Sequence, residues 1–413
     1  MKVIVLNSFN VFSENNATSN RWRTLIEGLA SHEVQILYLI TSGYKSAYEK
    51  LTFGKGGYLN TKIQYMYLTC QNRYNYIPAR INNYLINSIY AWANSITLRK
   101  IVKSIAPDYI LISPTFDAIL TFSKTYTRNE VSAQVVTELN EYNDIWDIHA
   151  TNKIQKWRNR KYNTLLRKKL FPKLDICLVM TDVLIKHYRK FQYCKESLIF
   201  FKVPMTVDLK RFDTFSINTK FEGPYIAYCG SGGFYTNGLD ILIRSFSLIS
   251  EDFPNLRLLI AAFWGQDGDR MLELINETKL NKKVVYLGVL GRDEIPPFLQ
   301  GAEALVLPRP ESRQASGGFP TKLGEYLATG RPVCASRVGE IPNYLIDGIS
   351  AYLHEPGNIF DLADSLKRVL NNKEESLKIG LNGRSVAQHH FNMEVQADRI
   401  FDLLKKRSIL NYS

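Results

Sequence analysis

Short apolar runs of strand length alternate with helical segments along the first half of the chain. The expected strands are Lys2–Asn7, Val34–Ile40, Asp108–Ile112, Gln134–Thr137 and Asp175–Met180. Between them, apolar residues recur every three or four positions over Arg21–Ala30 and Ile81–Ile105, which is the period of an amphipathic helix. This order predicts βαβ units and therefore a parallel sheet. No glycine-rich dinucleotide fingerprint follows the first strand, which argues against a dinucleotide cofactor.

The second half of the chain repeats the alternation and predicts a second α/β domain. Its expected strands are Tyr225–Cys229, Arg257–Ala262, Val284–Leu290, Ala304–Leu307 and Arg331–Ser336. Helical periodicity covers Phe360–Leu370, Ser376–Ala387 and 394–406. A chain of 413 residues is long enough for two domains with separate cores.

The stretch 304–348 carries the clearest chemical signal. After the strand that ends at Leu307, a polar loop with Arg309 and Arg313 leads through Gly317-Gly318 to a predicted helix that runs to about Thr329. Lys322 lies in the first turn, where the helix dipole disfavours a cation by a few tenths to ~1 kcal/mol. A bound anion would remove this penalty, and the free N–H groups of a helix start favour phosphate.

A carboxylate lies one turn further along the same helix. Glu325 follows Lys322 by three residues and so shares its face, while Leu323 and Leu327 point toward a core. The cation suits a diphosphate, and the carboxylate can accept hydrogen bonds from a ribose. The alternative is a solvated surface pair, but the neighbouring Gly-Gly, proline and arginines favour a nucleotide site.

The phrase FPTKLGEYLATGRPV, continued by VGEIPNYLIDGISAYL, resembles the nucleotide-sugar site of GT-B glycosyltransferases. The resemblance is to the retaining group called glycosyltransferase family 4, in particular to members that build bacterial polysaccharides. It implies that Glu325 holds the ribose and that Lys322, Arg309 and the N–H groups of Thr321 and Leu323 face the diphosphate. The resemblance is specific over residues 304–348 and looser over most of the chain.

The sequence departs from the family at one sugar contact. Many members carry a second glutamate where this chain has Gly317. Backbone groups of the 316–319 loop, including Gly318 and Phe319, are the expected replacement.

A second departure concerns the loop after Tyr225–Cys229. Relatives often have an arginine and a lysine where this chain has Ser231 and Thr236, so Arg309, Arg313 and Lys322 must supply the positive charge. The backbone of Gly230, Gly232 and Gly233 remains available to phosphates. The resemblance also implies weak contacts of the nucleotide base with Val289 and Leu290.

The resemblance further implies a GT-B fold, in which two doubly wound Rossmann-like domains face each other across a cleft. The segment VPMTVDLKRF (203–212) resembles the interdomain linker. The expected domains are 1–204 for the acceptor, 205–390 for the nucleotide sugar, and 391–413 as a helix that crosses back.

The segment ELNEYNDIW follows the strand that ends at Thr137. Where many relatives have a histidine that faces the donor, this chain offers Glu138 and Glu141. Either carboxylate could act as a base or orient the donor sugar. Acids that cap the next helix are an equally good interpretation.

Composition limits the class and location of the protein. No apolar run approaches a membrane span, and Met1-Lys2 leads straight into a strand, so we expect a cytoplasmic protein without a signal peptide. The five cysteines have no metal-binding spacing. Asp267-Gly268-Asp269 resembles a metal-binding motif of other transferases but precedes a helix, so we predict neither metal nor cofactor.

The net charge of +13 calls for an anionic partner. Residues 153–173 hold nine basic residues and no acid, with Trp157 and leucines at helical spacing. Such a helix can rest on an anionic membrane surface, here the inner face of the cytoplasmic membrane, or can be an ordinary helix with solvated charges. No zinc-finger or RNP-type motif supports nucleic acid.

The resulting prediction is a metal-independent retaining glycosyltransferase. It would move a sugar from a nucleotide diphosphate, expected to be UDP, to a hydroxyl of a lipid-linked or cell-surface glycan. The alternatives are an epimerase or phosphorylase on the same fold, and a non-catalytic subunit that binds a glycan or a partner.

Overall fold

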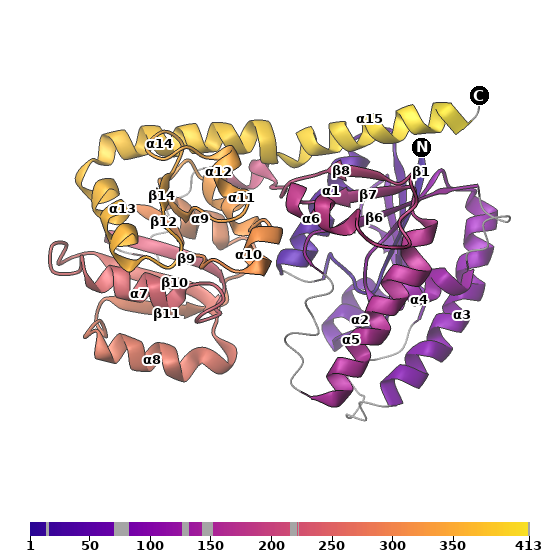
Figure 1. Cartoon of the computed structure of the whole chain (residues 1–413), viewed down its shortest axis with the longest axis horizontal. Coiled ribbons are helices and arrows are strands. Elements are labelled where there is room, and N and C mark those ends of the chain that lie inside the picture. The colour runs from indigo at the N-terminus through magenta and orange to yellow at the C-terminus, as the bar shows by residue number, and fades with distance from the viewer. Residues whose placement is uncertain are drawn as a thin grey trace. The chain divides into compact units, whose positions relative to one another are not determined.

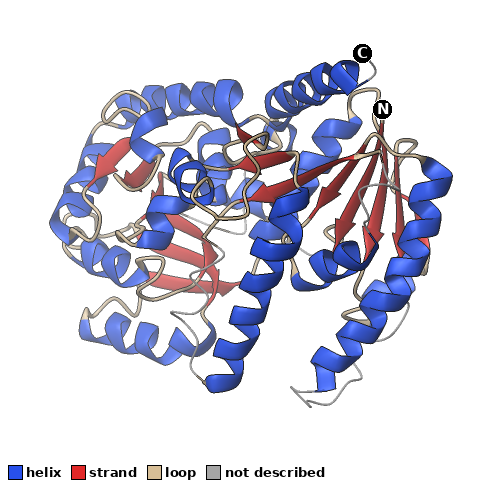
Figure 2. Cartoon of the chain, turned by 45° about the vertical axis from the view of Figure 1, so that its right-hand side comes forward, coloured by secondary structure: helices blue, strands red, loops and turns tan. Residues whose placement is uncertain are grey.

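The computed structural model describes residues 1–13, 16–69, 82–125, 132–142, 152–214, 221 and 223–411. These residues form two compact units (Figure 1). Unit 1 comprises Met1–Val203 and Ala397–Ser413, and unit 2 comprises Pro204–Gln396. Each unit is built around one sheet with helices packed along it (Figure 2).

The sheet of unit 1 has the order β3-β4-β2-β1-β5-β6-β7-β8, and every pair is parallel except β3 with β4. Its strands are β1 (Lys2–Asn7), β2 (Gln35–Ile40), β3 (Gly56–Tyr58), β4 (Ile63–Tyr67), β5 (Tyr109–Ile112), β6 (Gln134–Leu139), β7 (Ile176–Val179) and β8 (Ile199–Lys202). The chain reverses its direction of sheet growth between β1 and β5, as doubly wound folds do.

Helices cover the sheet of unit 1 and bury its apolar strands. They are α1 (Ala17–Ala30), α2 (Ala47–Phe53), α3 (Asn82–Ile105), α4 (Phe116–Thr125), α5 (Lys153–Leu165), the π-helix η3 (Leu166–Leu170), the 3₁₀ helix η4 (Phe171–Lys173) and α6 (Asp182–Tyr188). The end of the chain completes this core, because Ile400 and Leu404 of α15 (Met393–Asn411) are buried with Tyr109. The Tyr109 hydroxyl donates a hydrogen bond to the carbonyl of Leu404.

The sheet of unit 2 is entirely parallel, with the order β11-β10-β9-β12-β13-β14. Its strands are β9 (Tyr225–Ser231), β10 (Arg257–Phe263), β11 (Val284–Gly288), β12 (Ala304–Leu307), β13 (Val333–Ser336) and β14 (Tyr352–His354). The strands are apolar because helices bury both faces of a parallel sheet. Sheet growth reverses between β9 and β12.

The helices of unit 2 fill the crossovers between its parallel strands. They are η5 (Leu209–Phe212), α7 (Leu239–Ser247), η6 (Gly265–Asp267), α8 (Gly268–Glu277), α9 (Ile295–Gln300), α10 (Arg313–Gly317), α11 (Thr321–Ala328), α12 (Ile341–Tyr344), α13 (Ile359–Asn371), α14 (Lys373–Val386) and η7 (Ala387–Phe391). Among the described residues, no helix is both long enough and apolar enough to cross a membrane.

Four of the expected elements differ from the structure in their bounds or continuity. Strand β6 continues through Leu139, and β11 already ends at Gly288, whose φ of +71° leaves the strand region. The loop after Pro308 contains the short helix α10. The basic segment 153–173 is not one continuous helix: it ends in π and 3₁₀ turns, because Pro172 cannot donate the hydrogen bond that an α-helix needs.

Candidate functional site

The candidate site lies in unit 2 where sheet growth reverses, at the carboxyl ends of β9 and β12. Ligands of open parallel sheets bind outside the carboxyl ends of the strands at such a switch point. The loops that follow β9 and β12 come together at Gly238, which has a φ of +73°. A Cβ at Gly238 would overlap the carbonyl oxygen of Pro308, so only glycine permits this contact.

Lys322 is the cation of this switch point. It occupies the first turn of α11, and its ammonium donates a hydrogen bond to the Tyr228 hydroxyl at 2.5 Å. The same nitrogen lies 4.5 Å from the centroid of the Tyr228 ring. The Tyr228 hydroxyl in turn donates to the carbonyl of Ser231 at 2.7 Å. Tyr228, a buried residue of β9, therefore holds the Lys322 ammonium beside the last residues of that strand.

Gly230 makes room for this arrangement. A Cβ at Gly230 would lie 2.5 Å from the Lys322 nitrogen and 2.6 Å from its Cδ. Real Cβ atoms do not approach other atoms so closely, and any side chain would displace the lysine. Gly230, near the end of β9, thus leaves room for the side chain of Lys322 from α11.

The electrostatics of Lys322 favour an anion. Burial lowers the pKa of Lys322 to about 7, and the nearby charge of Arg309 lowers it in the same direction. The Leu323 N–H donates to the carbonyl of Pro320 at 3.0 Å, so its geometry does not favour the expected phosphate contact. The start of α11 still contributes partial positive charge. A diphosphate at this position would raise the pKa of Lys322 and so favour its protonated form. It would also accept hydrogen bonds from N–H groups of the first turn.

The rest of α11 is fixed against its surroundings. Tyr326 is buried, and its hydroxyl accepts a hydrogen bond from the Cys229 N–H at 2.8 Å and donates to the Cys229 carbonyl at 3.1 Å. Leu323 is buried in the core. At Gly324, a Cβ would lie 3.2 Å from the Cβ of Val207, so the helix packs closely on the segment that precedes η5.

Glu325 does not form a surface pair with Lys322. Its Oε1 accepts a hydrogen bond from the Arg211 guanidinium at 2.8 Å, and the two side chains are only 20% and 15% exposed. Arg211 also donates to the carbonyl of Arg292 at 2.9 Å. The Glu325 carboxylate is therefore held in one orientation by a residue of η5.

The residues of the loop before α11 that were expected to contact the nucleotide sugar differ in their burial and in their partners. Arg309 is half-buried and donates to the carbonyl of Gln314 at 3.4 Å, whereas Arg313 is exposed at the start of α10. The Gly318 N–H donates to the Gln314 carbonyl at 2.9 Å. Gly317 and Phe319 are buried, and the Phe319 ring packs against aromatic rings of α12 and η7. Thr321, the first residue of α11, is half-buried.

The glycines after Gly230 have structural partners. The Gly232 N–H donates to the Phe263 carbonyl at 3.1 Å, so its geometry does not favour the expected phosphate contact. A Cβ at Gly233 would lie 2.8 Å from the Asn237 amide nitrogen, which shows a tight turn. Val289 is 70% exposed and Leu290 half-buried, both just after β11.

Asp267, the first acid of the motif-like Asp-Gly-Asp, accepts a hydrogen bond from the Phe234 N–H at 3.1 Å. It therefore positions the loop after β9. In the part of the chain that the structure describes, no group of three or more His, Cys, Asp or Glu residues is placed to hold a metal ion.

Glu138 requires a correction. It lies inside β6 rather than in the loop after it, is 1% exposed, and forms an ion pair with the equally buried Arg21 of α1 at 3.1 Å. Burial raises the pKa of Glu138, while the charge of Arg21 opposes this shift. The contacts favour a structural role for Glu138. Glu141 follows β6 and is half-buried, and its carbonyl accepts a hydrogen bond from the Tyr188 hydroxyl.

Sequence reasoning missed Tyr228, Tyr326 and Arg211. The two tyrosines looked like ordinary core residues, although a tyrosine near the end of a buried strand needs a partner for its hydroxyl. Arg211 lies in the segment 203–212, and its charge is the only sequence feature that could have indicated a role in the site.

Comparisons with known proteins find glycosyltransferases as relatives. A family model described as glycosyl transferases group 1 matches residues 210–386, most of unit 2. An uncharacterized glycosyltransferase of Methanocaldococcus jannaschii is 26% identical over 61% of this chain and 82% of its own length. The D-inositol 3-phosphate glycosyltransferase of Mycolicibacterium smegmatis is 28% identical over 36% of this chain, and the match spans only 32% of that relative.

Solved structures share the fold of the whole chain. Sucrose-phosphate synthase from Thermosynechococcus elongatus has a TM-score of 0.76 at 16% identity, with all of both chains covered. The Anabaena protein HepE in complex with UDP-glucose has a TM-score of 0.68 at 12% identity, covering 98% of this chain and all of that one. The two sheets and these likenesses define a GT-B fold. The family match places a glycosyl transferases group 1 domain in unit 2, over residues 210–386.

The pKa of Lys322 predicts that nucleotide affinity depends on pH. A diphosphate favours the charged lysine, so the affinity for UDP should fall as pH rises from 7 to 9, by up to about tenfold per unit. Isothermal titration calorimetry over this range, where the terminal phosphate of UDP is already ionised, measures the slope. Lys322→Met should bind weakly at every pH, and the wild type should approach it at pH 9. A wild-type affinity that stays constant from pH 7 to 9 would contradict this account.

Proposed function

We propose that the chain is a retaining, metal-independent glycosyltransferase of the family 4 type. It transfers a sugar from a nucleotide diphosphate, with UDP as the preferred nucleotide, to a hydroxyl of a lipid-linked or cell-surface glycan. The observation that carries the proposal is the ammonium of Lys322, held over Gly230 at the switch point of unit 2. The structural likeness to HepE, solved in complex with UDP-glucose, supports UDP.

Unit 2 supplies the groups that stabilise the departing diphosphate. Lys322, Arg309 and the first N–H groups of α11 neutralise the charge that develops on its oxygens as the bond to the anomeric carbon breaks. Fixed donors of this kind contribute ~3–4 kcal/mol each to transition-state stabilisation. Glu325, oriented by Arg211, accepts hydrogen bonds from the ribose hydroxyls. No metal or cofactor has a role in this proposal.

The acceptor supplies the nucleophile. Its hydroxyl oxygen attacks the anomeric carbon from the side that the diphosphate leaves, which retains the configuration. The bond between this oxygen and the anomeric carbon forms as the bond to the diphosphate breaks, and the hydroxyl proton passes to an oxygen of the departing phosphate. Glu141, just after β6 in unit 1, remains the candidate carboxylate for orienting the acceptor.

Activity measurements on two matched pairs of variants test this function. Lys322→Ala and Glu325→Ala should each lose transfer or donor hydrolysis by about a hundredfold or more, with an unchanged melting temperature. Lys378→Ala and Glu374→Ala remove an exposed ion pair of α14 and should stay at the wild-type level. Mass spectrometry with UDP-, GDP- and ADP-sugars gives the readout.

The same assay separates the alternatives. An epimerase would change the donor without an acceptor, and a phosphorylase would need free phosphate. Calorimetry with UDP, GDP and ADP identifies a non-catalytic subunit, which would bind none of these nucleotides. Full activity of Lys322→Ala would exclude the proposed mechanism.

Unit 1 also supports the proposed contact of the 153–173 segment with an anionic membrane at the cytoplasmic face. In α5, Trp157 is 46% exposed, with the ammonium of Lys161 5.6 Å from its ring. In α3, Ile89, Trp92 and Ile96 are exposed on one face, and the helix contains no acidic residue. Both views show the first turns of α3 and α5 at the same end of unit 1 (Figures 1 and 2). Exposed tryptophans among basic residues suit the headgroup region of an anionic bilayer.

Vesicle sedimentation tests this contact. The protein should bind phosphatidylglycerol-containing vesicles and not pure phosphatidylcholine. Lys156→Glu/Arg160→Glu should weaken binding by about thirtyfold or more, since each basic residue near the surface contributes ~1 kcal/mol. Lys282→Glu/Lys378→Glu makes the same charge change in unit 2 as the control. Equal binding by both double variants would refute the contact.

A further inference from the structure

Phe263 is an exposed aromatic residue at the carboxyl end of the sheet of unit 2. It is the last residue of β10 and is 71% exposed. Its partner in the parallel register is Ser231, the last residue of β9, which follows the Gly230 that faces Lys322. Neighbouring strands lie ~4.8 Å apart, so Phe263 leaves the sheet one strand away from the position proposed for the diphosphate.

Phe263 also lies near the residue proposed to hold the ribose. Ala261 of β10 pairs with Cys229 of β9, and Phe263 lies two residues beyond Ala261, so the side chains of Phe263 and Cys229 share one face. Burial raises the pKa of the Cys229 thiol to about 12, and the nearby charge of Glu325 raises it further. Glu325 and Cys229 are therefore close together, one strand away from Phe263.

The end of β11 places a second exposed apolar residue beside β10. The register between the two strands shifts at Ala261, which pairs with Gly288, so Leu287 is an extra residue in β11. A bulge of this kind bends its strand, and bulges are frequent next to active sites. Val289 follows Gly288 and is 70% exposed. Phe263 and Val289 thus stand exposed at the ends of adjacent strands.

The loop that carries Val289 is tied to the ribose contact. The Arg211 guanidinium donates to the carbonyl of Arg292 at 2.9 Å and to the Glu325 carboxylate at 2.8 Å. One side chain therefore holds the carboxylate beside the loop after β11. The proposed ribose contact, this loop and the end of β10 form one continuous region of unit 2.

The backbone around Phe263 is fixed by its own contacts. The Phe263 carbonyl accepts a hydrogen bond from the Gly232 N–H at 3.1 Å. A Cβ at Gly265 would lie 3.2 Å from the Phe263 ring, so the ring rests against the backbone of this turn. The next residue, Trp264, is buried in the core and stacks on Tyr286 with the ring centroids 3.8 Å apart. The exposed ring is therefore preorganised, which lowers the entropic cost of binding a ligand.

We propose that Phe263 binds the nucleobase of the donor by stacking. The inference rests on the proposed function and adds to it the residue that holds the base. The diphosphate near the end of β9, the ribose at Glu325 and the base at the end of β10 follow one another in the order in which a nucleotide links them. Because every base has a π-face, this contact supplies affinity rather than a choice among bases.

Calorimetry with UDP and with pyrophosphate tests this contact. Phe263→Ala should weaken the binding of UDP by about tenfold or more, because it removes the stacking face. Phe263→Trp keeps an aromatic face and should retain most of the affinity. Pyrophosphate, which lacks the base, should bind equally to the wild type and to both variants. Phe263 is exposed, so both variants are expected to fold with an unchanged melting temperature.

Phe360→Ala is the matched control. Phe360 is 69% exposed, almost as much as Phe263, but it belongs to α13, which follows β14 at the opposite edge of the sheet from β11. Its variant should bind UDP as the wild type does. Proton NMR gives a second readout, because the ring current of Phe263 should shift the ring protons of bound uracil upfield in the wild type and not in Phe263→Ala.

The outcomes separate this inference from the proposed function. If the wild type binds UDP and Phe263→Ala binds it equally well, the base contact is refuted and the donor site stands. If Phe263→Ala loses affinity for pyrophosphate as strongly as for UDP, the residue acts on the phosphate loop, and the base contact is again refuted. If the wild type binds none of UDP, GDP and ADP, the donor site itself is refuted, and the base contact with it.

Discussion

The contact between the Lys322 ammonium and Tyr228, directly over Gly230, is the constraint on which the candidate site depends. It places a partly desolvated cation at the start of a helix, where the helix dipole and burial both oppose its charge. Without an anion this arrangement destabilises the protonated lysine. Under the proposed function, a bound nucleotide diphosphate would stabilise the protonated lysine, so this locally unfavourable feature would contribute to binding.

The parallel sheet of unit 2 explains why these groups meet. Its reversal between β9 and β12 leaves an open position at the carboxyl ends of the strands, and α11 returns to it from β12. Tyr326 fixes one turn of α11 to the backbone of β9. Arg211 fixes Glu325 from η5. The cation and the carboxylate are therefore held by different parts of unit 2.

The sequence predicted the local features of this site but not their partners. The positions of Lys322 and Glu325 on one short helix follow from local spacing. Their partners lie far away along the chain: Tyr228 is 94 residues from Lys322, and Arg211 is 114 residues from Glu325. The tertiary fold alone creates such contacts. Gly230 looked like a possible phosphate contact, and its closeness to Lys322 became evident only in three dimensions.

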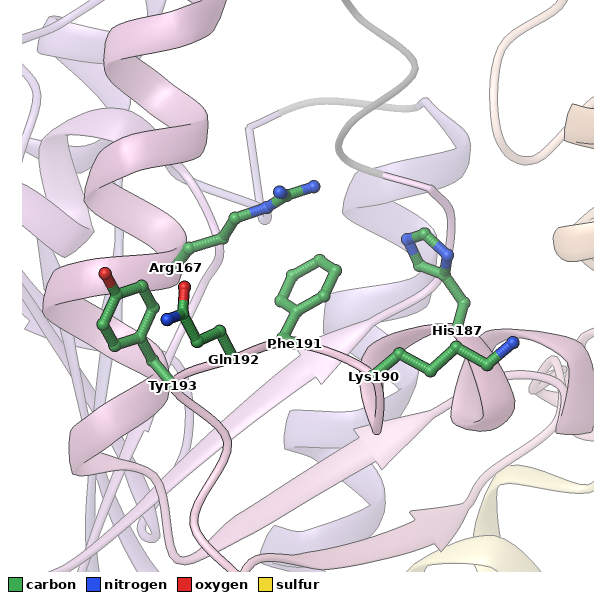
Figure 3. A pocket seen from close by; sticks show the side chains of 6 residues that line it. All are labelled: Arg167, His187, Lys190, Phe191, Gln192 and Tyr193. Carbon is green, nitrogen blue, oxygen red and sulfur yellow. The ribbon is translucent and has the colours of Figure 1, made fainter.

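The two parallel sheets and most strands could be predicted because buried strands are short apolar runs between amphipathic helices. The end of β6 was mispredicted because Glu138 is an acid inside a buried strand. The strand tolerates this carboxylate because Arg21, 117 residues away along the chain, pairs with it. A pocket in unit 1 (Figure 3) gave no motif, since its lining comes from η3, from α6 and from the loop before β8, which have ordinary composition. Its side chains come together only in the folded unit, where Phe191 contacts both Arg167 and His187.

NMR titration of Lys322, followed through labelled lysine side chains, tests the central claim most directly. The pKa should be about 7 in the ligand-free wild type, and it should move back toward the ordinary lysine value of about 10.4 in Gly230→Ala, where the added methyl displaces the ammonium. Gly268→Ala, whose Cβ has room 3.9 Å from its nearest neighbour, should leave the pKa unchanged. A wild-type Lys322 that titrates with the surface lysines would contradict the account.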